Sequence, residues 1–237
     1  MSEEIRSRLD QNLRAVRERI TSACQRANRS PETVTLVAVT KYAEMEWVQE
    51  LVNLGLADLG ESRPQQLVSR AKQLPENLRW HMIGHLQRNK AEDLLPKVSL
   101  IHSVDSLRLF SHLAKLGTTL THPPRILLEV NVSGETSKDG FDVQELFSVW
   151  PQMTTCESVQ IAGLMTMAPL DDNPEVARGV FRRLRECRDQ LRTESAGRCP
   201  LNELSMGMSG DFEVGIEEGA TIVRVGSRLF EGLTPRQ

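Results

Sequence analysis

The hydrophobic residues at the start of the chain recur every three or four positions, with charged residues between them. This spacing places them on one face of an α-helix, and polar helix-ending residues follow at Asn28, Ser30 and Pro31. The pattern therefore predicts one amphipathic helix over about residues 3–28. The positions on its apolar face are Ile5, Leu9, Leu13, Val16, Ile20, Cys24 and Ala27.

Short apolar runs then alternate with stretches of helical periodicity. The first run, residues 34–40, is rich in β-branched residues and uniformly apolar, which is typical of a strand covered on both faces. The strands expected in this way are 34–40, 57–60, 80–84, 99–104, 125–132, 159–167, 204–208 and 221–225. The helical stretches expected after the first seven are 44–54, 64–74, 86–95, 105–116, 142–153, 173–193 and 211–218, and a terminal turn follows the last strand. Asp105 is expected to cap one helix, and Asn173 with Pro174 to begin another.

Alternating β and α elements imply a parallel sheet. Eight such repeats predict an α/β fold of the (β/α)8 TIM type. We expect a single domain with an extra N-terminal helix and with the barrel at about residues 34–233. The competing topology is an open, doubly wound sheet, which usually carries Gly-x-Gly-x-x-Gly after its first strand. That position here reads Thr40-Lys-Tyr-Ala-Glu44, without glycine.

Composition narrows the class of protein further. The 237 residues include 29 Lys and Arg against 32 Asp and Glu, and only 4% are aromatic, which argues against nucleic acid or a membrane surface as partner. No apolar run approaches the roughly 18 residues of a membrane span, and the charged first residues do not resemble a signal peptide. The four cysteines are scattered, as expected for reduced thiols. We therefore expect a cytoplasmic protein.

Lys41 is the first candidate for chemistry, because barrels place their reactive groups at the carboxyl ends of the strands. Thr35, Val37, Val39 and Lys41 share one face if the strand alternation continues. A lysine at the end of a buried strand is desolvated, so its pKa is expected to fall. A neutral amine attacks aldehydes and forms Schiff bases. The alternative is that Lys41 reaches solvent or pairs with a carboxylate at the barrel mouth.

Arg224 is the second candidate. Alternation in the last strand places it opposite Val223 and Val225, which suit contact with helices, so we expect Arg224 to point into the barrel. A guanidinium inside a barrel cannot lose its proton and needs an acceptor.

The loops after the last two strands form the third candidate. Gly226 and Ser227 begin a turn with free backbone N–H groups, and Ser209 and Gly210 begin another. Loops after strands seven and eight of such barrels recurrently bind phosphate. A lysine for an aldehyde, an arginine for a ring nitrogen and a phosphate cradle together indicate pyridoxal 5′-phosphate (PLP).

Several short stretches are distinctive when they are taken together. They are Leu36-Val-Ala-Val-Thr-Lys41, Gly60-Glu-Ser62, Trp80-His-Met-Ile-Gly-His-Leu-Gln-Arg-Asn-Lys90, His102-Ser-Val-Asp-Ser106, Gly163-Leu-Met-Thr-Met167, Leu204-Ser-Met-Gly-Met-Ser209 and Val223-Arg-Val-Gly-Ser227. With these stretches the chain closely resembles the pyridoxal phosphate homeostasis protein family, from about residue 5 to residue 233. That family has a fold like the N-terminal barrel domain of alanine racemase.

The resemblance implies that Lys41 holds PLP as a Schiff base and that Arg224 contacts the pyridine nitrogen. It further implies cofactor contacts by a set of residues around the phosphate and the ring, namely Ser205, Met206, Ser209, Gly226 and Ser227. Ser62 departs from the pattern, because the family usually has asparagine there, and a serine offers one hydroxyl in place of an amide. We include Ser62 among the candidates on the resemblance alone.

The residue that contacts the pyridine nitrogen of PLP affects the expected catalytic activity. An arginine cannot give the pyridine nitrogen a full proton, so the ring is a poorer electron sink. Alanine racemase adds a second base from a further domain of its partner subunit, and we expect no equivalent here. The only tyrosine, Tyr42, is expected to face away from Lys41 because neighbours on a strand alternate.

We therefore expect a PLP carrier or buffer in vitamin B6 homeostasis, with effects on amino-acid and keto-acid balance and with little or no catalysis. Its expected partners are PLP and PLP-dependent apoenzymes that receive it, and its expected state is a monomer or weak dimer. The alternative is a single-domain PLP-dependent amino-acid racemase, and a third reading is a regulatory module whose partner senses PLP.

Histidines, pocket-lining candidates and a basic stretch complete the predictions. His81 and His85 would lie roughly 13 Å apart on a strand, so we expect no metal site. His85, Asn131 and Met165 could line the pocket, although packing inside the barrel suits Met165. The basic stretch over residues 178–192 is expected to be the exposed face of a helix.

Overall fold

A computed structural model describes residues 2–133 and 139–234. Its eight strands are all parallel and form one closed barrel in sequence order. The strands are β1 Thr35–Val39, β2 Asp58–Glu61, β3 Arg79–Met82, β4 Leu100–Val104, β5 Arg125–Glu129, β6 Gln160–Met165, β7 Glu203–Ser205 and β8 Ile222–Val225. The predicted TIM-type barrel is thereby confirmed.

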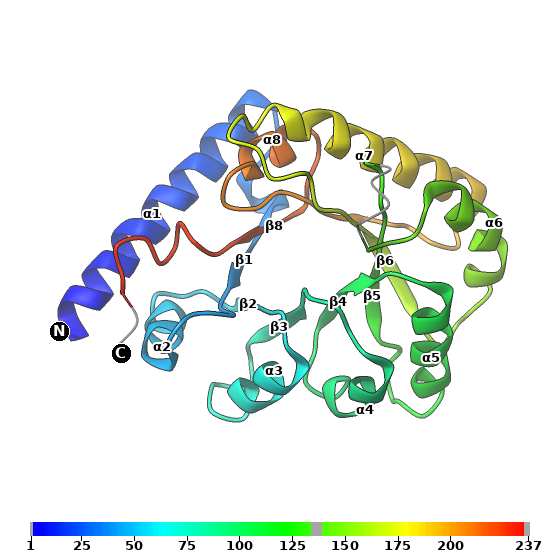
Figure 1. The fold of residues 1–237 in the computed structure, drawn as a ribbon, viewed down its shortest axis with the longest axis horizontal. Coiled ribbons are helices and arrows are strands. Elements are labelled where there is room, and N and C mark those ends of the chain that lie inside the picture. The colour runs from blue at the N-terminus through cyan, green and yellow to red at the C-terminus, as the bar shows by residue number, and fades with distance from the viewer. Residues whose placement is uncertain (1, 134–138, 235–237) are drawn as a thin grey trace.

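Helices surround this ring of strands (Figure 1). They are α1 Ser2–Arg26, α2 Met45–Asn53, α3 Pro64–Ala71, α4 Ala91–Leu94, α5 Leu107–Gly117, α6 Val143–Met153, α7 Val176–Glu194 and α8 Phe212–Glu217. The extra helix α1 packs against α8 and α2, outside the ring. None of the described helices combines the length and the apolar character needed to cross a membrane.

The core has two layers because side chains on a strand alternate between its faces. A small apolar cluster fills the barrel interior, and a larger one lies between the strands and the helices. Val37, Met165 and Ile222 belong to the inner cluster, while Val223 and Val225 belong to the outer one. The packing role suggested for Met165 is confirmed, and Arg224 lies between two outward-facing valines, as predicted.

Several element boundaries differ from the sequence prediction. Ser106 caps α5, with its Oγ accepting from the backbone N–H of Leu109, so the predicted cap at Asp105 is wrong. Asn173 makes a turn by accepting from the N–H of Glu175, and α7 begins only at Val176. The stretch expected as one helix over 86–95 is a 3-10 turn, Arg88–Lys90, followed by the short α4.

The basic face of α7 is not simply solvated. Arg178, Arg182 and Arg185 all form ion pairs with Glu218, which lies after α8, and Arg178 also pairs with Glu217. The predicted exposed face is confirmed for Arg182, Arg183 and Arg192, whereas Arg178, Arg185 and Arg188 are half-buried. The ion pairs attach α7 to α8, the helix that leads into β8.

Candidate functional site

Lys41 lies in the turn that follows β1, and its side chain is exposed. The strand ends at Val39, and the backbone N–H of Ala43 closes the turn by donating to the carbonyl of Thr40 at 2.9 Å. The predicted burial of Lys41 is therefore wrong, since the turn carries it out to the barrel mouth. The alternative that Lys41 reaches solvent is the one observed.

The same turn changes the expectation for Tyr42. The Lys41 Nζ lies 5.0 Å from the centroid of the Tyr42 ring, and 78% of Tyr42 is exposed. The alternation argument that separated the two side chains does not apply, because neither residue belongs to the strand. The ammonium and the ring face one another in an arrangement typical of a cation–π contact.

A buried ion pair holds the turn that carries Lys41. Arg70 of α3 donates to the carbonyls of Thr40 and Ala43, on either side of Lys41, and to the carboxylate of Glu61. The Thr40 hydroxyl donates to the same Glu61 oxygen at 2.6 Å. Burial raises the pKa of Glu61, while Thr40 and Arg70 oppose the rise. The sequence pattern does not reveal this clamp, formed by Arg70, Glu61 and Thr40; its one visible signal is the acidic residue just before Ser62.

Arg224 points into the barrel, as predicted, and is only 4% exposed. Its Nη1 donates to the carbonyl of Ser205 at 2.9 Å and to the Ser205 hydroxyl at 2.5 Å, and its Nη2 donates to the carbonyl of Thr166 at 3.0 Å. Burial lowers the pKa of Arg224 to about 10, which leaves it charged at neutral pH. No described residue accepts from its Nε–H or from the second hydrogen on Nη2, so donors remain for a further acceptor.

The turns after β7 and β8 are brought together. The backbone N–H of Gly226 donates to the Ser209 hydroxyl at 3.1 Å, and Arg228 donates to the Ser209 carbonyl. A Cβ on Gly226 would lie 3.2 Å from the Cβ of Val39, so glycine lets this turn pack against the end of β1. Ser227 is exposed beside it. The turns therefore lie next to the strand that leads to Lys41.

The side chains of the remaining candidates, Ser205, Met206 and Ser62, point in different directions. Ser205 is fully buried in the barrel interior under Arg224. Met206 packs in the outer apolar cluster, so only its backbone can face the mouth. Ser62 is half-buried after β2, so close to the third strand's end that a Cβ on Gly84 would lie 2.5 Å from its carbonyl oxygen.

Glu129 is a buried acidic residue at the mouth that the sequence pattern does not reveal. It ends β5, which is shorter than the predicted strand over residues 125–132, so Asn131 lies beyond the strand. Burial and the charge of Asp105 raise the pKa of Glu129 to about 7, although Arg224 opposes the rise. His85 is exposed, with its Nδ1 3.0 Å from a carboxylate oxygen of Asp105. A carboxyl group that titrates near neutrality thus lies near the buried guanidinium.

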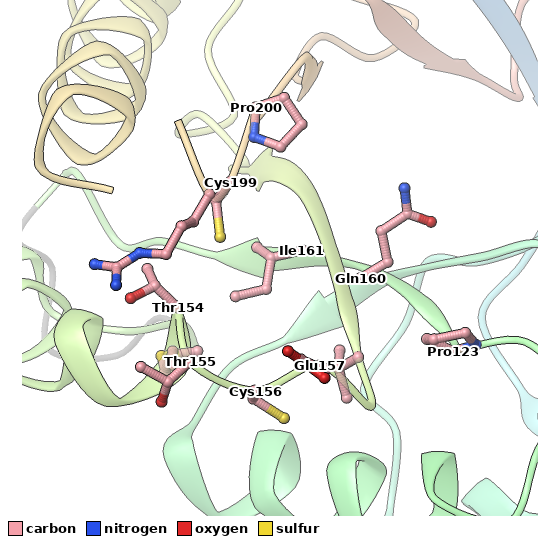
Figure 2. Close-up of a pocket in the computed structure, with 12 residues that line it drawn as sticks. Pro123, Thr154, Thr155, Cys156, Glu157, Gln160, Ile161, Cys199 and Pro200 are labelled. Carbon is pink, nitrogen blue, oxygen red and sulfur yellow. The ribbon is translucent and has the colours of Figure 1, made fainter. Parts of the chain in front are cut away.

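A surface pocket of about 670 Å³ lies elsewhere, at the end of the barrel where β6 and β7 begin (Figure 2). Its walls include Cys156, Gln160 and Cys199. Lys41 and Arg224 lie toward the opposite ends of their strands, so this pocket is separate from the candidate site.

The residues at the mouth fit PLP. They supply an accessible amine, a buried permanent cation with spare N–H donors, and adjoining turns with hydroxyl and backbone groups. These match an aldehyde, a ring nitrogen and a phosphate in turn.

Comparison with known proteins agrees with the fold and with the expected family. The family described as alanine racemase, N-terminal domain, matches residues 11–234. A curated relative from Aquifex aeolicus, called pyridoxal phosphate homeostasis protein, is 42% identical over 221 residues, which are 93% of this chain and 96% of that protein.

Solved structures agree as well. PipY of Synechococcus elongatus PCC7942 with PLP bound has a TM-score of 0.82 and 32% identity, over 94% of this chain and 99% of that one. A structure described as that of an unknown protein from Bifidobacterium adolescentis has a TM-score of 0.89 and 32% identity, over 97% of each chain.

Proposed function

This chain belongs to the pyridoxal phosphate homeostasis protein family, and on that premise we propose that it binds PLP and helps to keep the cellular supply of PLP in balance. The names of its relatives and the PLP-bound structure of PipY support this function. We propose the whole described chain as one PLP-binding unit.

The observation that carries the proposal is the buried Arg224 inside a barrel whose neighbouring strand leads to Lys41. Val37 pairs with Arg224 across β1 and β8, so the two groups belong to adjacent strands. The Nε–H of Arg224 makes no hydrogen bond to a described residue, so it can donate to an arriving acceptor, and a pyridine nitrogen is such an acceptor. Bound PLP would supply an aldehyde to an amine and an electron-withdrawing ring.

We assign the contacts as follows. The amine of Lys41 would bind the aldehyde, and Arg224 would donate to the ring nitrogen. Ser209, Gly226 and Ser227 would hold the phosphate. Ser205, the Met206 backbone and Ser62 would contact the remainder of the cofactor.

The proposed role is storage and delivery of PLP with little or no turnover. Arg224 stays charged at neutral pH and cannot protonate the ring nitrogen, which leaves a carbanion beside the ring poorly stabilised. PLP-dependent apoenzymes are the proposed recipients, with the protein acting as a monomer or weak dimer. The four unpaired cysteines suit a reducing compartment, and we propose the cytoplasm.

The test begins with an absorbance spectrum of the purified protein with PLP, followed by borohydride reduction and peptide mapping. We expect a visible band that reduction removes, with the label on Lys41. Lys41→Ala should abolish the band, and Lys115→Ala, at an exposed position on α5, should leave it unchanged. A label on another lysine would refute the site.

Turnover is tested separately, by following optical rotation with single-enantiomer amino acids. Racemisation at ordinary enzyme rates, about 1–1000 per second, would refute the carrier function.

A further inference from the structure

A chain of polar side chains crosses the apolar interior of the barrel. Asp58, at the start of β2, lies 3.1 Å from Nε2 of His81 on β3. The Nδ1 of His81 lies 2.9 Å from Nε2 of His102 on β4, and the Nδ1 of His102 lies 2.8 Å from the hydroxyl of Ser205 on β7. That hydroxyl accepts from Arg224. The chain thus links the entrance of β2 to the guanidinium proposed to face the cofactor.

The stability of the fold does not require these polar side chains inside the barrel. His102 and Ser205 are fully buried, among the apolar side chains that fill the rest of the interior. Buried polar networks are costly to satisfy, and well-packed apolar residues of similar volume are often as stable. Both ring nitrogens of His81 and both ring nitrogens of His102 nevertheless have a hydrogen-bond partner, so this polar network is complete.

The charge of Asp58 sets the direction of the hydrogen bonds. Burial opposes its ionisation, but hydrogen bonds from His81 and Arg79 lower the pKa of Asp58 below its ordinary value. It is therefore a carboxylate at neutral pH and can only accept. The Nε2 of His81 must donate to it, which leaves Nδ1 of a neutral His81 as an acceptor.

The remaining steps follow from His102. Burial lowers the pKa of His102 well below its usual value, and the charge of Arg224 adds to the shift, so its ring is neutral. Its Nε2–H donates to His81, and its Nδ1 must then accept the hydroxyl proton of Ser205. The lone pairs of Ser205 are left for Arg224. Each hydrogen bond points from Arg224 toward Asp58, and both histidines carry their proton on Nε2.

We propose that Asp58, His81 and His102 are positioning residues that orient Ser205 and, through it, Arg224 against the PLP ring. The relay presents Arg224 with a hydroxyl whose proton points away, and it fixes the plane of the guanidinium. This inference rests on the proposed function for its ligand, but the relay itself is a property of the PLP-free chain.

The first test uses the PLP-free protein. Nitrogen-15 NMR of labelled histidine, with His81→Gln and His102→Gln to assign the signals, should show both rings protonated on Nε2 at neutral pH. A proton on Nδ1 of either ring would overturn the relay. This measurement needs no PLP, so it separates failure of the relay from failure of the proposed function.

The second test reverses the relay from its far end. Arg79 and His81 both contact Oδ1 of Asp58, so the test uses the double variant Asp58→Asn with Arg79→Met, in which the amide nitrogen can face His81 without meeting a guanidinium. The amide can then donate to Nε2 of His81, and we expect the protons of both histidines to move to Nδ1. Arg79→Met is the matched control, because it removes the ion pair with Asp58 while the carboxylate remains, and the proton positions should stay unchanged.

The absorbance and affinity of bound PLP test whether the hydrogen bonds of the relay influence Arg224. In the double variant we expect the absorbance maximum of bound PLP to shift and its affinity to fall about tenfold, which is the worth of one hydrogen bond to a charged group. A merely structural Asp58 would lower stability but leave the histidine protons and the spectrum unchanged, which would overturn the proposal. Reversed protons with an unchanged spectrum would equally overturn the link to Arg224.

Discussion

Replacing Arg70 with methionine tests how the turn that carries Lys41 is held. The Arg70 side chain is 10% exposed and that of Glu61 is fully buried, so the substitution leaves a buried carboxylate without its cation. It also removes the donor to the carbonyls of Thr40 and Ala43. Removing one partner of a buried pair typically costs about 3–5 kcal/mol. We expect a loss of that size at pH 7.

The loss should depend on pH in a defined direction. The folded-state pKa of Glu61 already lies above its ordinary value because of burial, and without Arg70 it should rise further. A raised carboxyl pKa in the folded state means that stability is present at low pH and is lost as pH rises. The difference in stability between Arg70→Met and the parent protein should therefore be smaller near pH 4, where only the two carbonyl bonds are lost, and should grow toward pH 7.

Urea unfolding at several pH values measures this difference, provided that the m-value is unchanged. The matched control is the double variant Arg70→Met with Glu61→Gln, which removes the buried charge and should recover part of the loss at pH 7. A loss below about 1 kcal/mol that does not vary with pH would refute the buried-pair argument.

The other predictions concern single positions. Glu129→Gln should flatten the pH dependence of stability between about pH 4.5 and 7, where the raised pKa of Glu129 makes the parent less stable as pH rises; urea midpoints across that range would show it, and an unaltered slope would contradict it. Gly163→Ala should lower thermal stability strongly, because its Cβ would lie 1.8 Å from the carbonyl oxygen of Glu203, whereas Gly210→Ala has nothing within 4 Å and should be tolerated. Equal melting temperatures for these two variants would be inconsistent with the packing. Glu218→Gln should loosen α7 from α8 by breaking ion pairs to three arginines, and hydrogen exchange should quicken in both helices without a change in the strands.

The periodicity of the chain was enough to predict the barrel and the direction of Arg224. Helix and strand periods are local properties, and a two-residue alternation places Arg224 opposite its valine neighbours whatever the rest of the fold does. The positions of Ser209 and Gly226 after the last two strands followed from the same element order.

Only the tertiary structure decided which side chains meet. The place where β1 ends is set by pairing with its neighbours, and that boundary puts Lys41 in an exposed turn. His102 and Ser205 are 103 positions apart in sequence, and barrel closure brings them to 2.8 Å. Local patterns state the face on which a residue lies, but strand register and barrel closure determine what lies across from it. For that reason the Arg70 clamp, the acidic Glu129 and the histidine relay could be found only in three dimensions.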